Sequence, residues 1–170
     1  PLLVHANDWQ TGLTAPLLAL EEERPATLFT IHNLAYDGHF SQADFNKLGL
    51  PPAWWSAEAA EFYGGFSMLK AGMVFSDHVT TVSPTYAKEI CTPEFGNRFE
   101  GVLSALGDKL TGILNGIDLD VWNPQTDEYI VQNYSVDNKF IEAKFANKKD
   151  LLSRTGLAQS DAPLLGFVGR

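Results

Sequence analysis

The chain has 170 residues, of which 45% are hydrophobic and 19% charged, so it can bury an apolar core and is not a disordered tail. Its formal net charge of −9 argues against a nucleic-acid-binding protein, which would present a basic surface to phosphates. No apolar run approaches the roughly 18 residues of a membrane-spanning helix, and the single cysteine, Cys91, excludes an intrachain disulfide.

Strand-like and helix-like segments alternate from the start of the chain. Residues 2–5 form a short apolar run that predicts a buried strand. Asp8 then stands where a helix N-cap belongs, and residues 9–22 carry apolar side chains at helical spacing, which predicts a helix. Residues 28–31 predict the next strand, which ends at His32.

A turn-rich segment, 33–61, separates these elements from the next ones. Residues 62–75 are mostly apolar and predict a buried helix. Residues 78–82 predict a strand. Ser83 and Pro84 then predict the start of a helix, because serine caps a helix and proline fits its first position.

The last third of the chain continues the alternation. Residues 110–114 predict a strand, and the Asn-Pro pair at 123–124 indicates an extended connector. Residues 137–154 are rich in Lys, Glu, Ala and Leu and predict a helix, with Gly156 at its C-terminal cap. Residues 164–168 predict a final strand.

Strands that alternate with helices predict an α/β fold, with a Rossmann-like parallel sheet and flanking helices. A strand buried in such a sheet needs neighbours on both sides. Because the chain opens in one predicted strand and stops in another, we expect it to be a piece of a longer polypeptide.

Polar residues follow the predicted strands at the point where each one ends. They are Asn7 and Asp8, His32 and Asn33, Ser83, Asn115 and Arg170. In open parallel sheets, ligands bind beyond the carboxyl ends of the strands. The pattern therefore favours a small-molecule site at this edge, although Asn and Ser at such points also serve as caps.

Two segments carry a family likeness. Residues 5–13, HANDWQTGL, are similar to H-x-x-D-W-H/Q-T/A-G/A-L, and residues 30–38, TIHNLAYDG, are similar to T-V/I-H-N-L/I-A/S-Y-x-G. Further matches follow at LKAG, TVSPTYA, LNGID and WNP, in residues 69–72, 81–87, 114–118 and 122–124. In order and spacing these segments resemble the bacterial-type glycogen synthase and starch synthase family, over essentially the whole chain.

The resemblance implies a GT-B glycosyltransferase, in which two Rossmann-like domains enclose a nucleotide-sugar cleft. It implies retaining transfer of glucose from ADP-glucose, or from UDP-glucose in some members, to the non-reducing end of an α-1,4-glucan. Residues 1–118 would be the later part of the N-terminal domain, 119–162 the interdomain connection with its helix, and 163–170 the first strand of the C-terminal domain.

No cofactor, nucleic acid or membrane is expected as a partner. No metal is expected either, because the His, Cys, Asp and Glu residues show no recognised metal spacing. The resemblance places the enzyme in a bacterial cytoplasm, with the plastid stroma as the alternative.

Three residues match family positions near the reaction. His32 resembles the histidine that faces the transferred glucose, where polar groups stabilise the positive charge of the anomeric carbon. Asp8 resembles a polar residue on the sugar and acceptor side, with a plain helix N-cap as its alternative. Arg170 resembles the arginine that neutralises the departing diphosphate, a role that suits a permanently charged, bidentate guanidinium.

The residues expected to bind substrate are Asn33, Tyr36, Asn115 and Trp9. Trp9 offers an aromatic face to a glucan or, alternatively, belongs to the core. Trp54 and Trp55 leave the same two possibilities open. Gln10 stands where many relatives have histidine, and its amide cannot transfer a proton.

Some parts of the family pattern are absent from these 170 residues. They are the Lys-x-Gly-Gly-Leu loop, the lysine just beyond Arg170 and the C-terminal glutamate near the donor sugar. We therefore expect this piece alone to show no transferase activity. Two alternatives remain for the whole protein, namely a non-catalytic glucan-binding relative and a GT-B enzyme that uses another acceptor.

Overall fold

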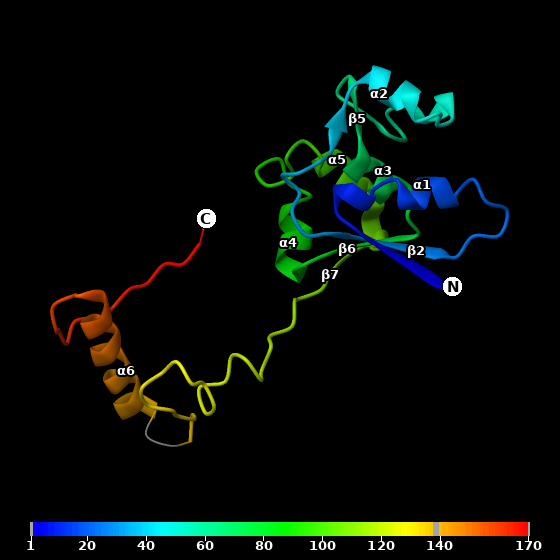
Figure 1. Ribbon diagram of the computed structural model, residues 1–170. Coiled ribbons are helices and arrows are strands. Elements are labelled where there is room, and N and C mark those ends of the chain that lie inside the picture. Colours follow the sequence, from blue (N-terminus) through cyan, green and yellow to red (C-terminus); the bar gives the residue numbers. More distant parts are fainter. Residues whose placement is uncertain (1, 138–139, 170) are drawn as a thin grey trace. The chain divides into compact units, whose positions relative to one another are not determined.

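A computed structural model describes residues 2–137 and 140–169 of the chain (Figure 1). The chain divides into two units, Pro1–Asn115 and Gly116–Arg170. Each unit is described by itself below.

A four-stranded parallel sheet forms the centre of the first unit. Its strands are β1 (Leu3–Asn7), β2 (Ala26–Ile31), β6 (His78–Thr81) and β7 (Leu110–Gly112), in the order β1-β2-β6-β7. The predicted strands at 28–31 and 78–82 are confirmed, and the strand predicted at 110–114 ends two residues earlier. The strand predicted at 2–5 is also present, but it is not buried, because β1 lies at the edge of the sheet and Leu3 is 53% exposed. The predicted α/β class with a parallel sheet is confirmed.

Helices connect successive strands of this sheet. A 3-10 turn, η1 (Trp9–Thr11), and α1 (Thr14–Leu18) lie between β1 and β2, and α3 (Met68–Phe75) precedes β6. Between β6 and β7 come α4 (Pro84–Glu89), α5 (Glu100–Leu106) and the turn η3 (Gly107–Lys109). Figure 1 shows α1 and α3 on the same side of the sheet. Each new parallel strand is added on the same side of the one before it. Right-handed crossovers then place the connecting helices on the same face of the sheet.

The main core fills the space between this face of the sheet and the helices. Phe29, Ile31 and Val79 point into it from β2 and β6, and Leu69 and Met73 meet them from α3. All five side chains are fully buried. Their alternation along the strands and their spacing along the helix are the pattern of a sheet face covered by one helix.

The single helix predicted over 9–22 is wrong, because η1 and the short α1 replace it. Pro16 lies in the first turn of α1, where its missing N–H is tolerated, whereas a longer helix from residue 9 would need that N–H to donate to the carbonyl of Gly12. Gly12 also lies where the backbone of η1 approaches the start of α3. A Cβ at Gly12 would be 1.9 Å from the carbonyl oxygen of Met68.

The helix predicted over 62–75 is wrong in its first six residues. Only α3 is helical, and β4 (Glu61–Phe62) and β5 (Gly65–Ser67) precede it. Tyr63 and Gly64 turn the chain between these strands with φ angles of 49° and 80°, which a right-handed helix does not accommodate. Apolar composition alone does not reveal such a turn.

These two strands belong to a second, antiparallel sheet with β3 (His39–Phe40), in the order β3-β5-β4. Together with α2 (Gln42–Lys47) and the turn η2 (Pro52–Trp54), they form a small layer, most of which comes from the segment predicted to be rich in turns. Its own small core is built around Phe45 and Phe66, whose ring centroids are 5.3 Å apart.

The second unit contains one helix, α6 (Phe140–Thr155), within the part of the chain that the structure describes. Its predicted first residues include 138–139, which lie outside the described residues. Gly156 ends the helix as predicted, with a φ of 71°, and the amide of Leu157 donates to the carbonyl of Leu152 at 2.9 Å.

The strand predicted at 164–168 is not formed within the described residues. Residues 164–169 form no regular structure, and the side chains of Leu165 and Phe167 are 92% and 86% exposed. A β-strand requires a hydrogen-bonded neighbour, and no described residue pairs with this segment. The assignment of 119–162 to an interdomain connection and of 163–170 to the first strand of a second domain stays a prediction.

Candidate active site

The carboxyl ends of β1 and β2 are joined by Asp8 and His32. The amide of Asp8 donates to the carbonyl of Thr30 at 2.9 Å, and its carboxylate oxygen Oδ1 accepts from the amide of His32 at 2.8 Å. Asp8 has a φ of 56°, a strained angle for a residue with a side chain. The two hydrogen bonds extend the pairing of the strands beyond their last regular residues.

The alternative that Asp8 is a plain helix cap is therefore wrong. Asp8 precedes the turn η1, but its side chain makes no capping hydrogen bond there. Its carboxylate instead fixes the backbone of His32, which lies 24 residues further along the chain. Sequence pattern alone could not reveal this contact, because it depends on how β1 and β2 pair.

The imidazole of His32 lies beside Asn7, the last residue of β1. Nε2 of His32 is 2.9 Å from Oδ1 of Asn7. Both residues are exposed, so the rest of the imidazole is open to a ligand. The sequence marks Asn7 only as a polar strand end, and no local pattern indicates its contact with the predicted catalytic histidine.

The loop after β2 carries two predicted substrate-binding residues. Oδ1 of Asn33 accepts from the amide of Ala35 at 3.0 Å, so part of this side chain stabilises the turn. Leu34 is fully buried and anchors the loop to the core. Tyr36 follows with its side chain 62% exposed, free to meet a ligand near His32.

Trp9 partly fits both of its predicted roles, which are contact with a glucan and packing in the core. Its ring is half-buried and packs against Gly38 of the loop after β2. The centres of the Trp9 and Phe40 rings lie 6.1 Å apart. It also packs against the main core. Trp9 thus connects the end of β1 to the loop after β2 and keeps part of its surface open.

Trp54 and Trp55 belong to the small core. Their ring centroids lie 4.7 Å from Phe75 and 5.3 Å from Phe45, respectively, and both residues are only half-exposed. Both pack against the buried cluster around Phe45. This packing favours the core alternative for both residues.

The other strand ends contribute less to this site. Oγ of Ser83 accepts from the amides of Thr85 and Tyr86 and caps α4, as predicted. Asn115 is exposed and lies three residues beyond β7, which is two strands away from β2. The structure joins Asp8 to His32 by a hydrogen bond, with Trp9 beside Asp8 and Asn33 and Tyr36 in the loop after His32, whereas no hydrogen bond connects Asn115 to these residues in the described part of the chain. Arg170 lies outside the described residues.

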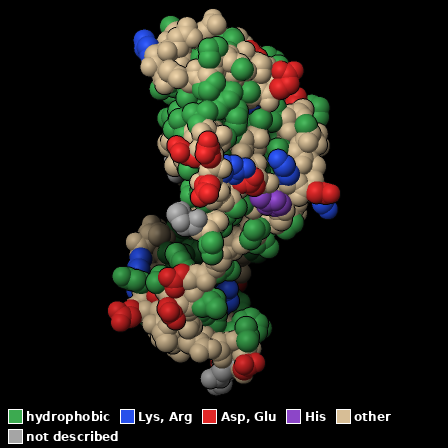
Figure 2. Space-filling view, turned by 90° about the vertical axis from the view of Figure 1, so that its right-hand side faces the viewer, with side chains coloured by type: hydrophobic (Ala, Val, Ile, Leu, Met, Phe, Trp, Pro, Cys, Tyr) green, Lys and Arg blue, Asp and Glu red, His purple; other side chains and the backbone are tan. Residues whose placement is uncertain are grey.

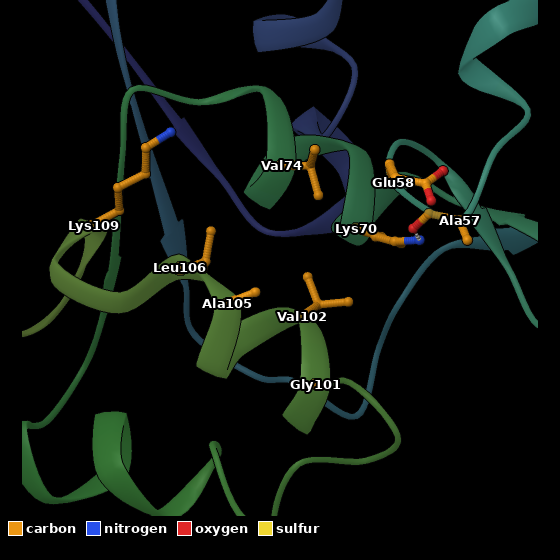
Figure 3. Close-up of a pocket in the computed structure, with 9 residues that line it drawn as sticks. All are labelled: Ala57, Glu58, Lys70, Val74, Gly101, Val102, Ala105, Leu106 and Lys109. Atoms are coloured by element: carbon orange, nitrogen blue, oxygen red, sulfur yellow. Dashed lines mark hydrogen bonds between the residues drawn. The ribbon is translucent and has the colours of Figure 1, made fainter.

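A cavity of about 510 Å³ lies elsewhere, between α3 and α5 (Figure 3). Figure 3 shows Val74 and Lys70 of α3 facing Val102 and Ala105 of α5. None of the predicted site residues lines it. Burial lowers the pKa of Lys70, whose ammonium donates to the carbonyls of Ala57 and Glu61. This lysine is structural, and the cavity is separate from the strand ends.

The described residues add three observations on metal binding, surface charge and membrane-spanning helices. They contain no group of three or more His, Cys, Asp or Glu side chains able to hold a metal ion. On the face shown in Figure 2, lysine and arginine are interspersed with acidic side chains rather than gathered in one basic patch. Of the helices in residues 2–137 and 140–169, none is long and apolar enough to cross a bilayer.

Comparison with known proteins decides the family. A family profile described as starch synthase catalytic domain matches residues 1–105. The chain belongs to the starch synthase catalytic domain family. This confirms the family that the sequence motifs indicated.

Members of the wider family resemble the chain over its full length. It is 56% identical to glycogen synthase 2 of Nitrosococcus oceani and 55% identical to glycogen synthase of Hydrogenovibrio crunogenus, and each alignment covers 100% of the chain. The chain covers 34% and 36% of these two proteins. It thus spans about a third of the length of the curated relatives that it matches.

A solved structure agrees with this family at the level of the fold. The chain matches the catalytic domain of starch synthase IV from Arabidopsis thaliana, bound to ADP and acarbose, with a TM-score of 0.80 and 32% identity. The match covers 95% of this chain and 34% of that chain. The predicted likeness to part of a GT-B glycosyltransferase is confirmed.

Proposed function

We propose that the protein of which this chain is a part is a glycogen or starch synthase. It transfers glucose from a nucleotide-sugar donor to the non-reducing end of an α-1,4-glucan, with retention of configuration. The donor is ADP-glucose, with UDP-glucose as the alternative, and the reaction takes place in the bacterial cytoplasm, with the plastid stroma as the alternative. Membership of the starch synthase catalytic domain family supports this proposal.

One observation carries the assignment of the site. Asp8 fixes the backbone of His32 through a 2.8 Å hydrogen bond, at the edge of the sheet where open α/β folds bind ligands. His32 is itself exposed, so its carbonyl and imidazole are accessible to a sugar. Held dipoles of this kind stabilise charge that develops in the transition state and need no reorganisation.

Each residue of the site has its own role in the proposed reaction. His32 faces the glucose as positive charge builds on the anomeric carbon. Asp8 keeps His32 in place, since one carboxylate oxygen already accepts from its backbone. Tyr36, Asn33 and Trp9 border the sugar-binding surface on the loop and turn beside it.

Arg170 and Asn115 complete the proposal from further along the chain. The guanidinium of Arg170 neutralises the departing diphosphate, for which a permanent, bidentate charge is suited. Asn115 lines the sugar and acceptor side.

The proposal is tested by substituting His32 with alanine in the full-length protein. We expect a fall in kcat of about 100-fold or more, typical of losing one preorganised electrostatic contact. The measurement is incorporation of glucose into glycogen from ADP-glucose and, in parallel, from UDP-glucose. Near-normal turnover in His32→Ala would show that His32 has no role in the transfer.

His78→Ala is the matched control. His78 begins β6 at the opposite end of the strands and bonds Thr111 at 3.0 Å on the surface. Its substitution is expected to leave turnover within about twofold, as for a surface change away from the site. The 170-residue chain alone should incorporate no glucose, and measurable incorporation by it contradicts the view that the missing segments are required.

A further inference from the structure

Asn7 and His32 lie on the same face of the sheet although 25 residues separate them. The parallel register pairs Asn7 with Thr30, and His32 follows Thr30 by two residues. Since side chains two residues apart along a strand share a face, the register brings the side-chain amide of Asn7 to the imidazole of His32. The contact thus follows from the pairing of β1 with β2.

Asn7 is itself held firmly. Its backbone N–H donates to Oγ1 of Thr11 at 2.7 Å, and the same hydroxyl donates to the backbone carbonyl of Asn7 at 2.6 Å. The backbone of His32 is fixed separately, through Oδ1 of Asp8. The histidine is therefore held at two points, at its backbone by Asp8 and at its ring by Asn7.

The atoms of the ring contact determine the direction of the hydrogen bond. Oδ1 of an asparagine amide only accepts, so Nε2 of His32 must carry the proton that joins the two groups. In a neutral imidazole, Nδ1 is then an acceptor. An arrangement of this kind is a common way in which a neighbour fixes the tautomer of a functional histidine.

We propose that Asn7 is a positioning residue that holds His32 as the Nε2–H tautomer and directs the free lone pair of Nδ1 toward a hydroxyl group of the substrate sugar. The sugar part rests on the proposed function, whereas the tautomer does not. A donor hydroxyl matched to a fixed acceptor orients the glucose without adding charge to the site.

The tautomer is measured directly by NMR of full-length protein labelled with 15N at histidine. The His32 signals are assigned by their loss in His32→Gln, and the 15N shifts are recorded where the ring is neutral. We expect a protonated Nε2 and an unprotonated Nδ1 in the wild type. Asn7→Leu, which removes the acceptor, should shift both signals toward a mixture of tautomers, and Asn7→Asp, which keeps an oxygen there, should retain the Nε2–H form.

Activity provides the second readout in the same variants. Asn7→Leu should lower kcat by about 10-fold, because a misoriented group loses part of its transition-state contact. KM for the glucan should change by less than about twofold, as expected when only transition-state stabilisation is lost. The control is Asn46→Leu, the same exchange on exposed α2, which should alter neither the His32 signals nor kcat.

The two proposals fail in different ways. A protonated Nδ1 in the wild type, or unchanged 15N shifts in Asn7→Leu, overturns the role of Asn7 whatever the enzyme does. Normal turnover in His32→Ala, together with an Nε2–H signal of His32 in the wild type, overturns the proposed function of His32 and the sugar contact, and it leaves the fixed tautomer established.

Discussion

The indole ring of Trp9 lies directly against the backbone of Gly38. An ideal Cβ placed on Gly38 would be only 2.4 Å from Cε3 of Trp9, and Gly38 has a φ of 58°. The carbonyl of Gly38 also accepts from the amide of Met68 at 3.1 Å, at the start of α3. One glycine thus allows η1, the loop after β2 and α3 to meet beside His32.

Gly38→Ala is expected to lower the free energy of unfolding by about 2–3 kcal/mol. About 1–2 kcal/mol comes from the left-handed backbone, and the remainder comes from forcing the Trp9 ring away from the new methyl group. Urea denaturation measures the loss. In the full-length enzyme, movement of Trp9 and of the loop that carries Tyr36 should also raise KM for the glucan.

Gly49→Ala isolates the backbone contribution. Gly49 has a similar φ of 64°, but no atom lies within 4 Å of a Cβ placed there. Its substitution should therefore cost only about 1 kcal/mol. An equal loss of stability in the two variants would show that the contact with Trp9 contributes nothing.

A second prediction concerns pH and the ion pair between Arg24 and Asp77. Nη1 and Nη2 of Arg24 donate to the two carboxylate oxygens at 2.6 and 2.7 Å, and the amide of Thr27 donates to Oδ2 at 2.7 Å. The hydrogen bonds from Arg24, followed by those from Thr27, hold the pKa of Asp77 well below its usual range. Asp77 thus stays ionised in the folded protein at a pH where the unfolded chain is already protonated.

The stabilisation is therefore complete above about pH 5 and declines as the pH falls through about 4, the ordinary pKa of aspartate. Asp77→Asn should lower the free energy of unfolding by about 1–2 kcal/mol at pH 7, a modest value because the Asp77 side chain is 42% exposed. The difference from the wild type should shrink at pH 3. Urea denaturation at both pH values checks this, with exposed Asp108→Asn as the control. A difference that grows toward pH 3 would contradict the assignment.

Features that depend on a few neighbouring residues were predictable from the sequence. The apolar runs of β1, β2 and β6 gave their positions, Ser83 predicted the start of α4, and Gly156 predicted the end of α6. Each signal acts within about four residues of its effect. The family motifs likewise indicated His32 and Asp8 as site residues.

Contacts across the sheet were not predictable in this way. The pattern around Asp8 leaves a helix cap open as the alternative to a sugar-side role, yet its carboxylate accepts from the amide of His32 beyond the neighbouring strand. Asn7 could be connected to His32 only once the register between β1 and β2 was known. Tyr63 adopts a left-handed angle that no propensity of tyrosine predicts. The tertiary structure decides these positions.

A third prediction concerns Lys70, which is only 3% exposed. Its ammonium donates to the carbonyls of Ala57 and Glu61, the two ends of the segment that leads into β4. Lys70→Met keeps the length of the side chain but leaves both carbonyls without this donor. We expect a loss of about 2–3 kcal/mol in the free energy of unfolding, measured by urea denaturation.

Lys47→Met is the control for this exchange. Lys47 is 74% exposed and pairs with Asp44 on the surface of α2. Its replacement should change stability by less than about 1 kcal/mol, as for an exposed ion pair. If Lys70→Met matches or exceeds the stability of the wild type, the cost of burying the ammonium outweighs its hydrogen bonds.

A final prediction separates two opposing effects at Arg98. Its guanidinium carbon lies 3.6 Å from the centre of the Tyr63 ring, whereas its backbone has an unfavourable φ of 73°. Arg98→Ala loses the ring contact and keeps the strained angle, so it should be less stable than the wild type by about 0.5–1 kcal/mol. Arg98→Gly also loses the contact but relieves the backbone, so it should be about 1 kcal/mol more stable than Arg98→Ala.

The order of the two variants is the decisive measurement, because it depends only on the backbone. At Lys88, on the exposed face of α4, the same pair should show the opposite order, with glycine about 1 kcal/mol less stable than alanine. Urea denaturation of all four variants gives both comparisons. If Arg98→Ala is as stable as Arg98→Gly, the chain does not adopt the left-handed turn at this position. The contact between Arg98 and Tyr63 would then lose its structural basis, because this turn directs the guanidinium over the ring.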